Sequence, residues 1–488
     1  MKKNTLTITI FFLLMALCFS SISFAASKKP IILTLQDAIL LAIRNNPDLQ
    51  SAELDRVVQK YAVVVAKNEF EPQFSLTGSL SRTISQSDNS TTGTTSYSIT
   101  PEASIKTGIG TEFTFTSNNP VVDNQYNPAL ILKITQPLIR GFGQAVVEAS
   151  LNNALDSEAI NKLNLKNTVI TTINQVITNY FAVVQAQKTL VTDRLSLKRY
   201  EDTVANDQAM ITAGRMARGD IVQAQAQVET QKVSIENDIN NIKQAHLTLL
   251  DSLGIDIYAN VQLPKTIDFR SIASTLIGKK MLTLNEFNAF ALKNNINYQT
   301  TGISLKQLAR DVVVAKDNQR WKLDLTASQT AGGGTGGGKN SGLESLVNGR
   351  NHATEAELDL SIPIDDVAAK QQEIQTTIAL QQANINYKEL KKQLEINITN
   401  AYNTIQSTRQ QVVLAERALA LQQRTVEIAR IKRNAGRLST FELLNDQRDL
   451  TTADQTVTNS LITYINSLTV MNQILGTTLD RFGIWIKY

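Results

Sequence analysis

Residues 33–46 read LTLQDAILLAIRNN, and residues 282–295 repeat the pattern as LTLNEFNAFALKNN. The two copies lie 249 residues apart, and the same offset still relates VVVAK at residues 63–67 to VVVAK at residues 312–316. Self-similarity at one fixed spacing is the signature of a repeated structural unit. The chain is therefore predicted to consist of two similar halves.

A second pair of motifs shows where the halves differ. Residues 213–215 and 435–437 both read AGR, and the dipeptide LG at residues 253–254 returns at residues 475–476, with a common offset of 222. The first half thus holds about 27 additional residues between its matched blocks, and its Gly- and Ser-rich segments are the place for them.

The domain boundaries follow from these matches. Residues 26–254 are predicted as the first structural repeat and residues 282–488 as the second. Residues 255–281, which contain Pro264 and lack sustained periodicity, are predicted as the connector.

Each half contains one very long predicted helix, at residues 145–210 and 366–432. Neither stretch contains proline, and Ile398 and Ile405 belong to a heptad-like series in the second. At 1.5 Å per residue each helix would be ~100 Å long. A short helix at residues 35–70 and a return helix at 219–253 together match that length, so stacked end to end they could partner it.

Segments between the helices alternate like strands with one apolar face. Residues 355–364 place Leu358 and Leu360 on one side and Glu357 and Asp359 on the other, which suits lipid against one face and water against the other. Residues 97–117 form an additional predicted hairpin in the first half. The sequence leaves open whether this hairpin joins the same sheet.

The first residues are predicted to be an exported leader. Lys2 and Lys3 precede an apolar run at residues 8–17, and small residues precede Ala26, so residues 1–25 are expected to be a cleaved signal peptide. The remaining chain contains no stretch of about 18 apolar residues that would predict a transmembrane helix.

Charge and residue content argue against several classes of function. The 48 Lys and Arg residues nearly balance the 44 Asp and Glu residues without forming runs, which does not fit nucleic-acid binding. The only histidines, His246 and His352, lack partners at metal-ligand spacing. The Gly-rich run at residues 332–339 resembles a phosphate loop, but Asn340 replaces its Ser or Thr. We expect no enzyme activity, cofactor or metal.

The opening motif with Pro47, the Gln-Pro-Leu at residues 136–138, the two Gly turns and the duplicated order of elements together resemble the TolC family of outer-membrane efflux and secretion channels. The resemblance implies an α+β fold in which a homotrimer, with four strands per chain, forms a transmembrane β-barrel continued by a periplasmic α-helical barrel. It also implies contact with outer-membrane lipid, a periplasmic adaptor protein and an inner-membrane transporter.

The resemblance also places candidate functional residues at the helix tips. Acidic or polar residues after the tips could shape the periplasmic entrance: Glu442, Asn445, Asp446 and Asp220. Residues of the two tips could contact the adaptor: Gly214, Arg215, Gly436 and Arg437. The alternative for Glu442 is a first-turn acid at a helix N-terminus.

The predicted function is a passive duct of a tripartite efflux pump or a type I secretion system, which exports small toxic compounds or proteins. Two alternatives stay open. One is a periplasmic coiled-coil scaffold with a small sheet, and the other is a surface adhesin on the same barrel, in which the Gly-rich loop would bind a partner.

Overall fold

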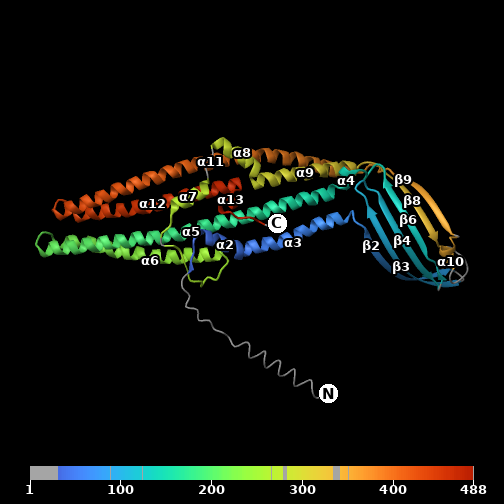
Figure 1. Cartoon of the computed structure of the whole chain (residues 1–488), viewed down its shortest axis with the longest axis horizontal. Coiled ribbons are helices and arrows are strands. Elements are labelled where there is room, and N and C mark those ends of the chain that lie inside the picture. The colour runs from blue at the N-terminus through green and yellow to red at the C-terminus, as the bar shows by residue number, and fades with distance from the viewer. Residues whose placement is uncertain are drawn as a thin grey trace, which may run out of the picture.

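The chain forms an elongated molecule with a curved sheet at one end and two helical hairpins reaching the other (Figure 1). This computed structural model describes residues 31–87, 90–123, 125–264, 266–278, 283–333, 341–349 and 351–486. The predicted leader and residues 334–340 of the Gly-rich run lie outside them.

The helices follow one order in both halves. The first half contains α2 (Leu35–Asn45), α3 (Pro47–Asn68), α4 (Gln144–Val147), α5 (Ala149–Thr212), the short 3-10 helix η1 (Arg218–Asp220) and α6 (Ile221–Ser252). The second half contains α8 (Leu284–Asn294), α9 (Ile296–Asp317), α10 (Ser341–Asn348), α11 (Val367–Asn434), α12 (Thr440–Leu475) and α13 (Thr478–Phe482). Between the halves lie β7 (Val261–Gln262), which pairs with β1 (Ile31–Ile32), and α7 (Phe269–Ile277). None of the helices in the described ranges is long and apolar enough to cross a bilayer.

The single helix predicted over residues 35–70 is wrong, because the structure has two helices there. Asn46 separates α2 from α3 with extended backbone angles, and Asn295 separates α8 from α9 in the same way. Pro47 disfavours a helical residue before it, but Ile296 occupies the matching place in the second half, so proline is not the common cause. The shared cause is the asparagine, whose side chain caps the next helix in both halves.

The same asparagines join two helices end to end. Asn46 Nδ2 donates to the Ser252 carbonyl at the end of α6, at 3.0 Å, and Asn295 Nδ2 donates to the Ile474 carbonyl near the end of α12, at 2.8 Å. As a result α3 continues the line of α6 beside α5, and α9 continues the line of α12 beside α11 (Figure 1). The predicted end-to-end stacking is confirmed, with α3 and α9 as the stacked pieces.

Glycine is needed where these junctions close. Gly254 has φ +64°, and a Cβ added to it would overlap the Asn45 carbonyl. Gly476 has φ +66°, and its Cβ would lie 2.9 Å from the Asn294 carbonyl oxygen. The repeated Asn-Asn and Leu-Gly motifs are thus two sides of one contact, made once in each half.

The main core surrounds these junctions. It contains Ile173, Ile177 and Phe181 of α5 together with Ile465 and Leu468 of α12, all buried. Because both long helical hairpins supply side chains to this one cluster, the two halves are packed together at mid-length.

The sheet has six main antiparallel strands in the order β2-β3-β4-β6-β8-β9. They are β2 (Gln73–Ser87), β3 (Ser90–Lys106), β4 (Glu112–Val122), β6 (Ala129–Pro137), β8 (Lys322–Gly332) and β9 (His352–Ser361), and the two-residue β5 (Gln125–Tyr126) pairs with β4 alone. The expectation of four strands per chain is therefore wrong. The additional residues of the first half form the β3–β4 hairpin, which joins the sheet between β2 and β6.

The β3–β4 hairpin turns back at the helical end of the sheet. Residues 107–111 form this turn, in which the Gly110 N–H donates to the Thr107 carbonyl at 2.9 Å. The Gly143 N–H, just before α4, donates to the Ile109 carbonyl at 3.2 Å. The inserted hairpin is therefore attached to the start of the long-helix segment.

The close contact at Gly254 gives a stability prediction. Gly254→Ala should lower the free energy of unfolding by about 1–3 kcal/mol more than Gly214→Ala, because the methyl group overpacks the Asn45 carbonyl. Gly214 is the matched control, since it has φ +69° but open space around its Cβ position. Denaturant unfolding followed by circular dichroism measures both variants, and equal losses would show that only backbone strain matters.

Candidate functional site

The two helical hairpins each end in a turn of the same type, far from the sheet (Figure 1). At the first tip the Arg215 N–H donates to the Met210 carbonyl and the Gly214 N–H to the Ile211 carbonyl, at 2.9 and 3.0 Å. At the second tip Arg437 and Gly436 make the equivalent bonds, both at 2.9 Å. This is the Schellman motif, which requires a left-handed residue and explains the repeated Gly-Arg pair.

The return helices begin differently at the two tips. Ser439 caps α12 in a capping box: the Glu442 N–H donates to Ser439 Oγ, while Glu442 Oε2 accepts from the Ser439 N–H at 3.0 Å. These bonds to Ser439 hold the pKa of Glu442 below its usual value. At the first tip Asp220 ends η1 and makes no side-chain cap for α6. Glu442 therefore helps to cap the N-terminus of α12, and its side chain remains exposed to solvent.

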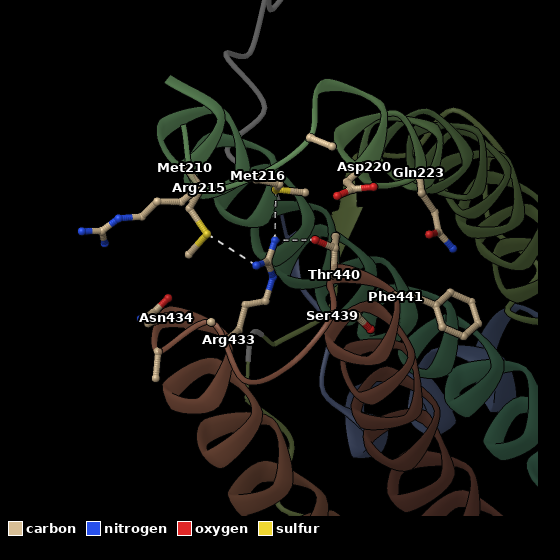
Figure 2. Close-up of a pocket in the computed structure, with 13 residues that line it drawn as sticks. Met210, Arg215, Met216, Asp220, Gln223, Arg433, Asn434, Ser439, Thr440 and Phe441 are labelled. Atoms are coloured by element: carbon tan, nitrogen blue, oxygen red, sulfur yellow. Dashed lines mark hydrogen bonds between the residues drawn. The ribbon is translucent and has the colours of Figure 1, made fainter. Parts of the chain in front are cut away.

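A hollow of about 780 Å³ lies between the two tips (Figure 2). Asp220 and Gln223 line it from the first hairpin, and Ser439, Thr440 and Phe441 from the second. Of the four entrance candidates, only Asp220 lines this hollow, whereas Glu442, Asn445 and Asp446 lie on α12 beyond it. Of the tip candidates, Arg215 and Gly436 line it, and Gly214 and Arg437 are exposed outside it.

A buried arginine at this hollow links the two hairpins. Arg433 of α11 binds Asp207 of α5 at 2.5 Å, and its guanidinium also donates to Thr440 Oγ1 at 2.5 Å. Thr440 in turn donates to the second Asp207 oxygen at 2.9 Å. The sulfurs of Met210 and Met216 lie 3.4 and 3.3 Å from the Arg433 guanidinium (Figure 2). The three linked side chains Asp207, Arg433 and Thr440 are called the tip cluster below.

Neither Asp207 nor Arg433 is among the residues that the sequence singles out. The residues that match these two positions at the 222-residue offset are Ile211 and Ala429, so the tip cluster has no repeated counterpart. Both residues lie among other polar side chains of their helices, so the sequence does not distinguish them.

The contact between α5 and α12 is polar from the tip cluster toward mid-length. Side chains of the two helices are hydrogen-bonded in a series: Thr203 with Gln447 (3.2 Å), Ser196 with Thr451 (3.0 Å), Asp193 with Gln455 (3.0 Å), Thr192 with Asp454 (2.5 Å) and Gln185 with Asn459 (2.8 Å). We call this series the polar seam. Beyond it the same two helices meet through the apolar core.

Two buried carboxyl groups lie at the polar seam. Asp193 of α5 and Asp238 of α6 are each less than one-tenth exposed. Burial and the neighbouring Asp193 raise the pKa of Asp238 to about 6. Gln231 and Gln455 donate to Asp193, and Arg199 is the nearby cation. The pair thus lies between the two helices of the first hairpin, and Asp193 also reaches Gln455 of the second hairpin.

His246 makes a contact that supports the fold. His246 Nε2 lies 3.0 Å from the Val261 carbonyl, next to β7. Within the described ranges no group of three or more His, Cys, Asp or Glu side chains is arranged to hold a metal ion.

Comparison with known proteins adds to this geometry. The model of the family described as "Outer membrane efflux protein" matches residues 109–255. The outer membrane efflux protein BepC of Brucella suis biovar 1 (strain 1330) is 21% identical over 463 residues, which cover 93% of this chain and 88% of BepC. The chain is therefore similar to outer-membrane efflux proteins of the TolC family.

Solved channel structures share the fold of this chain. The Campylobacter jejuni outer membrane channel CmeC has a TM-score of 0.67 and 14% identity, with 93% of this chain and 90% of CmeC covered. The structure of CusC gives a TM-score of 0.68 and 18% identity, with 92% and 95% covered. This chain therefore has the fold of solved outer-membrane channels.

The tip cluster gives a second stability prediction. Arg433→Ala leaves Asp207 as an uncompensated buried charge, and breaking a buried pair in this way costs about 3–5 kcal/mol. Arg437→Ala, on an exposed side chain of the same tip, should change stability by less than about 0.5 kcal/mol. Thermal unfolding of both variants measures the difference, and similar Tm values would rule out a stabilising role for the pair.

The carboxyl pair predicts a pH dependence. Because the folded pKa of Asp238 is raised to about 6, the folded state holds a proton that the unfolded state releases above about 3.8. This contribution to stability is therefore present at low pH and is lost as pH rises from about 4 to 6. Asp238→Asn should flatten the stability curve over that window, whereas Asp256→Asn, on an exposed residue, should leave its slope unchanged.

Proposed function

We propose that three copies of this chain form a passive exit duct that completes a tripartite export system with a periplasmic adaptor and an inner-membrane transporter. One observation carries the proposal. A sheet with an apolar face and a polar face continues directly into helices long enough to form a tube wall. Such a sheet suits lipid outside and water inside, and the family model that matches residues 109–255 describes outer membrane efflux proteins.

Uncovered apolar helix faces support assembly of several copies. On α3, Leu54, Val58, Tyr61 and Val65 are each more than 60% exposed, although α3 packs against α5 on its other side. On the corresponding half of α11 the exposed side chains include Ile374, Ile378 and Ile385. Apolar stripes on a long helix indicate a helix-to-helix contact. A neighbouring copy would cover them and close the tube.

The helix tips are the proposed contact for the adaptor. Arg215 and Arg437 are both exposed and stand one residue after the turn glycines Gly214 and Gly436. Two cations on two equivalent turns would bind acidic or backbone carbonyl groups of a partner. The surrounding hollow, lined by Phe441 and Met216, offers the apolar part of the same contact.

The entrance is proposed to lie just inside the tips. Asp220, Glu442, Asn445 and Asp446 lie within the first turns after the tips on α6 and α12. Three copies would bring these groups toward one axis, where carboxylates favour cations. The polar seam supports an entrance that can widen, because water can replace its hydrogen bonds when the hairpins separate.

Conductance and oligomeric mass together test the duct. The detergent-purified protein should be trimeric and should give discrete current steps in a planar lipid bilayer. A water-soluble species without conductance would instead support the scaffold alternative. The adhesin alternative predicts that deletion of the Gly-rich loop abolishes adhesion while export is unchanged, so unchanged adhesion after the deletion would exclude it.

Glu442→Gln tests the entrance separately from folding. Glutamine also serves at this position of a capping box, so α12 should still begin normally while one charge per chain is removed. We expect the cation preference of single channels to fall about two-fold or more, as read from the reversal potential in a salt gradient. The control is Glu389→Gln, on an exposed residue in the middle of α11. An unchanged reversal potential in Glu442→Gln would place the selective ring elsewhere.

A further inference from the structure

The β3–β4 hairpin is a full part of the sheet. Its first strand pairs with β2 from Ser90 against Ser87 to Ser104 against Gln73. Its second strand pairs with β6 from Glu112 against Thr135 to Asn118 against Ala129. Because ladders run along both sides of the insertion, moving it out of the sheet would leave β2 without its partner strand and β6 paired only with β8.

The inserted strands also continue the two faces of their neighbours. On one face, Leu80 lies opposite Tyr97, which lies opposite Val121, and Phe115 lies opposite both Ala103 and Leu132. On the other face, Ser79 Oγ bonds Ser98 Oγ at 2.8 Å and Ser81 Oγ bonds Ser96 Oγ at 2.7 Å. A strand in the wall of a membrane barrel needs an apolar side toward lipid and a polar side toward the lumen. A hairpin that lay inside the lumen as a plug would be surrounded by water and would not need the apolar side.

The sheet has two unpaired edges, β2 and β9, in the described chain. An open edge within lipid leaves backbone groups without hydrogen bonds, so the sheet must close through other copies. We propose that the barrel of the trimer has eighteen strands, six from each of three chains, with β3 and β4 as wall strands. The inference rests on the proposed trimeric duct and adds the size of its outer-membrane pore.

The strand number sets the pore width. Barrel diameter grows roughly linearly with strand number, and barrels of 16–18 strands enclose an aqueous channel. Eighteen strands give a barrel about half again as wide as twelve. The polar face carries hydroxyl groups along β2 and β3 and the carboxylates Glu355, Glu357 and Asp359 on β9. The outer-membrane segment would therefore pass hydrated, bulky or cationic cargo, and the tips would limit its size.

Two adjacent positions of β3 test the wall assignment. Ile99 is 60% exposed on the apolar face, and Thr100, opposite Thr77, is on the polar face. Each is changed to Cys after the sole cysteine, Cys18, has been replaced by Ser. With the protein in lipid nanodiscs, a charged water-soluble thiol reagent should modify Thr100→Cys at least ten-fold faster than Ile99→Cys. Equal rates would show that β3 is surrounded by water and would overturn the proposal.

End-on electron-microscopy averages of the same nanodiscs count the strands directly. Eighteen strands support the proposal, and twelve overturn it. Deletion of residues 90–122 should narrow the barrel to twelve, because β2 and β6 run in opposite directions and can pair directly. If the chain without residues 90–122 does not fold, the reaction rates of the two cysteine variants and the strand count of the full-length protein still test the proposal. A faster Thr100→Cys reaction in an assembly that is not trimeric would reject the proposed trimer and its strand number but retain β3 in the wall.

Discussion

The architecture depends on one hydrogen bond made twice, from an asparagine amide to the last turn of a return helix. Asn46 and Asn295 each cap one helix and hold the end of another, so two shorter helices act as one rod. Each rod then packs beside an unbroken helix of 64 or 68 residues. A helix of that length is stabilised mainly by the side chains packed against it, so the junction determines whether both halves of it are covered.

The contact between the two hairpins changes character along its length. Near the junctions it is an apolar core, and toward the tips it becomes the polar seam that ends in the tip cluster. Apolar burial holds helices together in water, whereas a hydrogen bond between side chains contributes little net stability because water can replace it. The apolar core therefore holds the hairpins together at mid-length, and the polar seam is the part of their contact whose hydrogen bonds water can replace, with the buried Arg433–Asp207 pair at its tip end.

Much of this fold could be predicted from the sequence because repetition leaves a strong signal. The offsets indicated a repeat and located the insertion, the proline-free heptad pattern located both long helices, and the Gly-Arg pairs marked both tips. The helix break at Asn46 was missed, since an asparagine inside an amphipathic pattern also fits a continuous helix. The predicted number of four strands was wrong, because the sequence did not show whether the hairpin at residues 97–117 lies in the sheet or beside it. Pairing between Asp207 and Arg433 depends on how two halves pack, and neither pattern nor repeat encodes it. The entrance and adaptor residues, and the division into repeats and connector, stay predictions.

Four of the six strands run directly into helices, while β3 and β4 are joined to each other by the turn at residues 107–111. In the proposed trimer, each chain would therefore contribute more strands to the barrel than strand-to-helix connections to the helical tube. The turn at residues 107–111 joins the two strands that have no helix of their own. The hydrogen bond from Gly143 to Ile109 attaches this turn to the start of the neighbouring helix α4. Lengthening or removing such a hairpin changes the perimeter of one end of the molecule without altering a single helix. The two ends can consequently vary in diameter independently of each other.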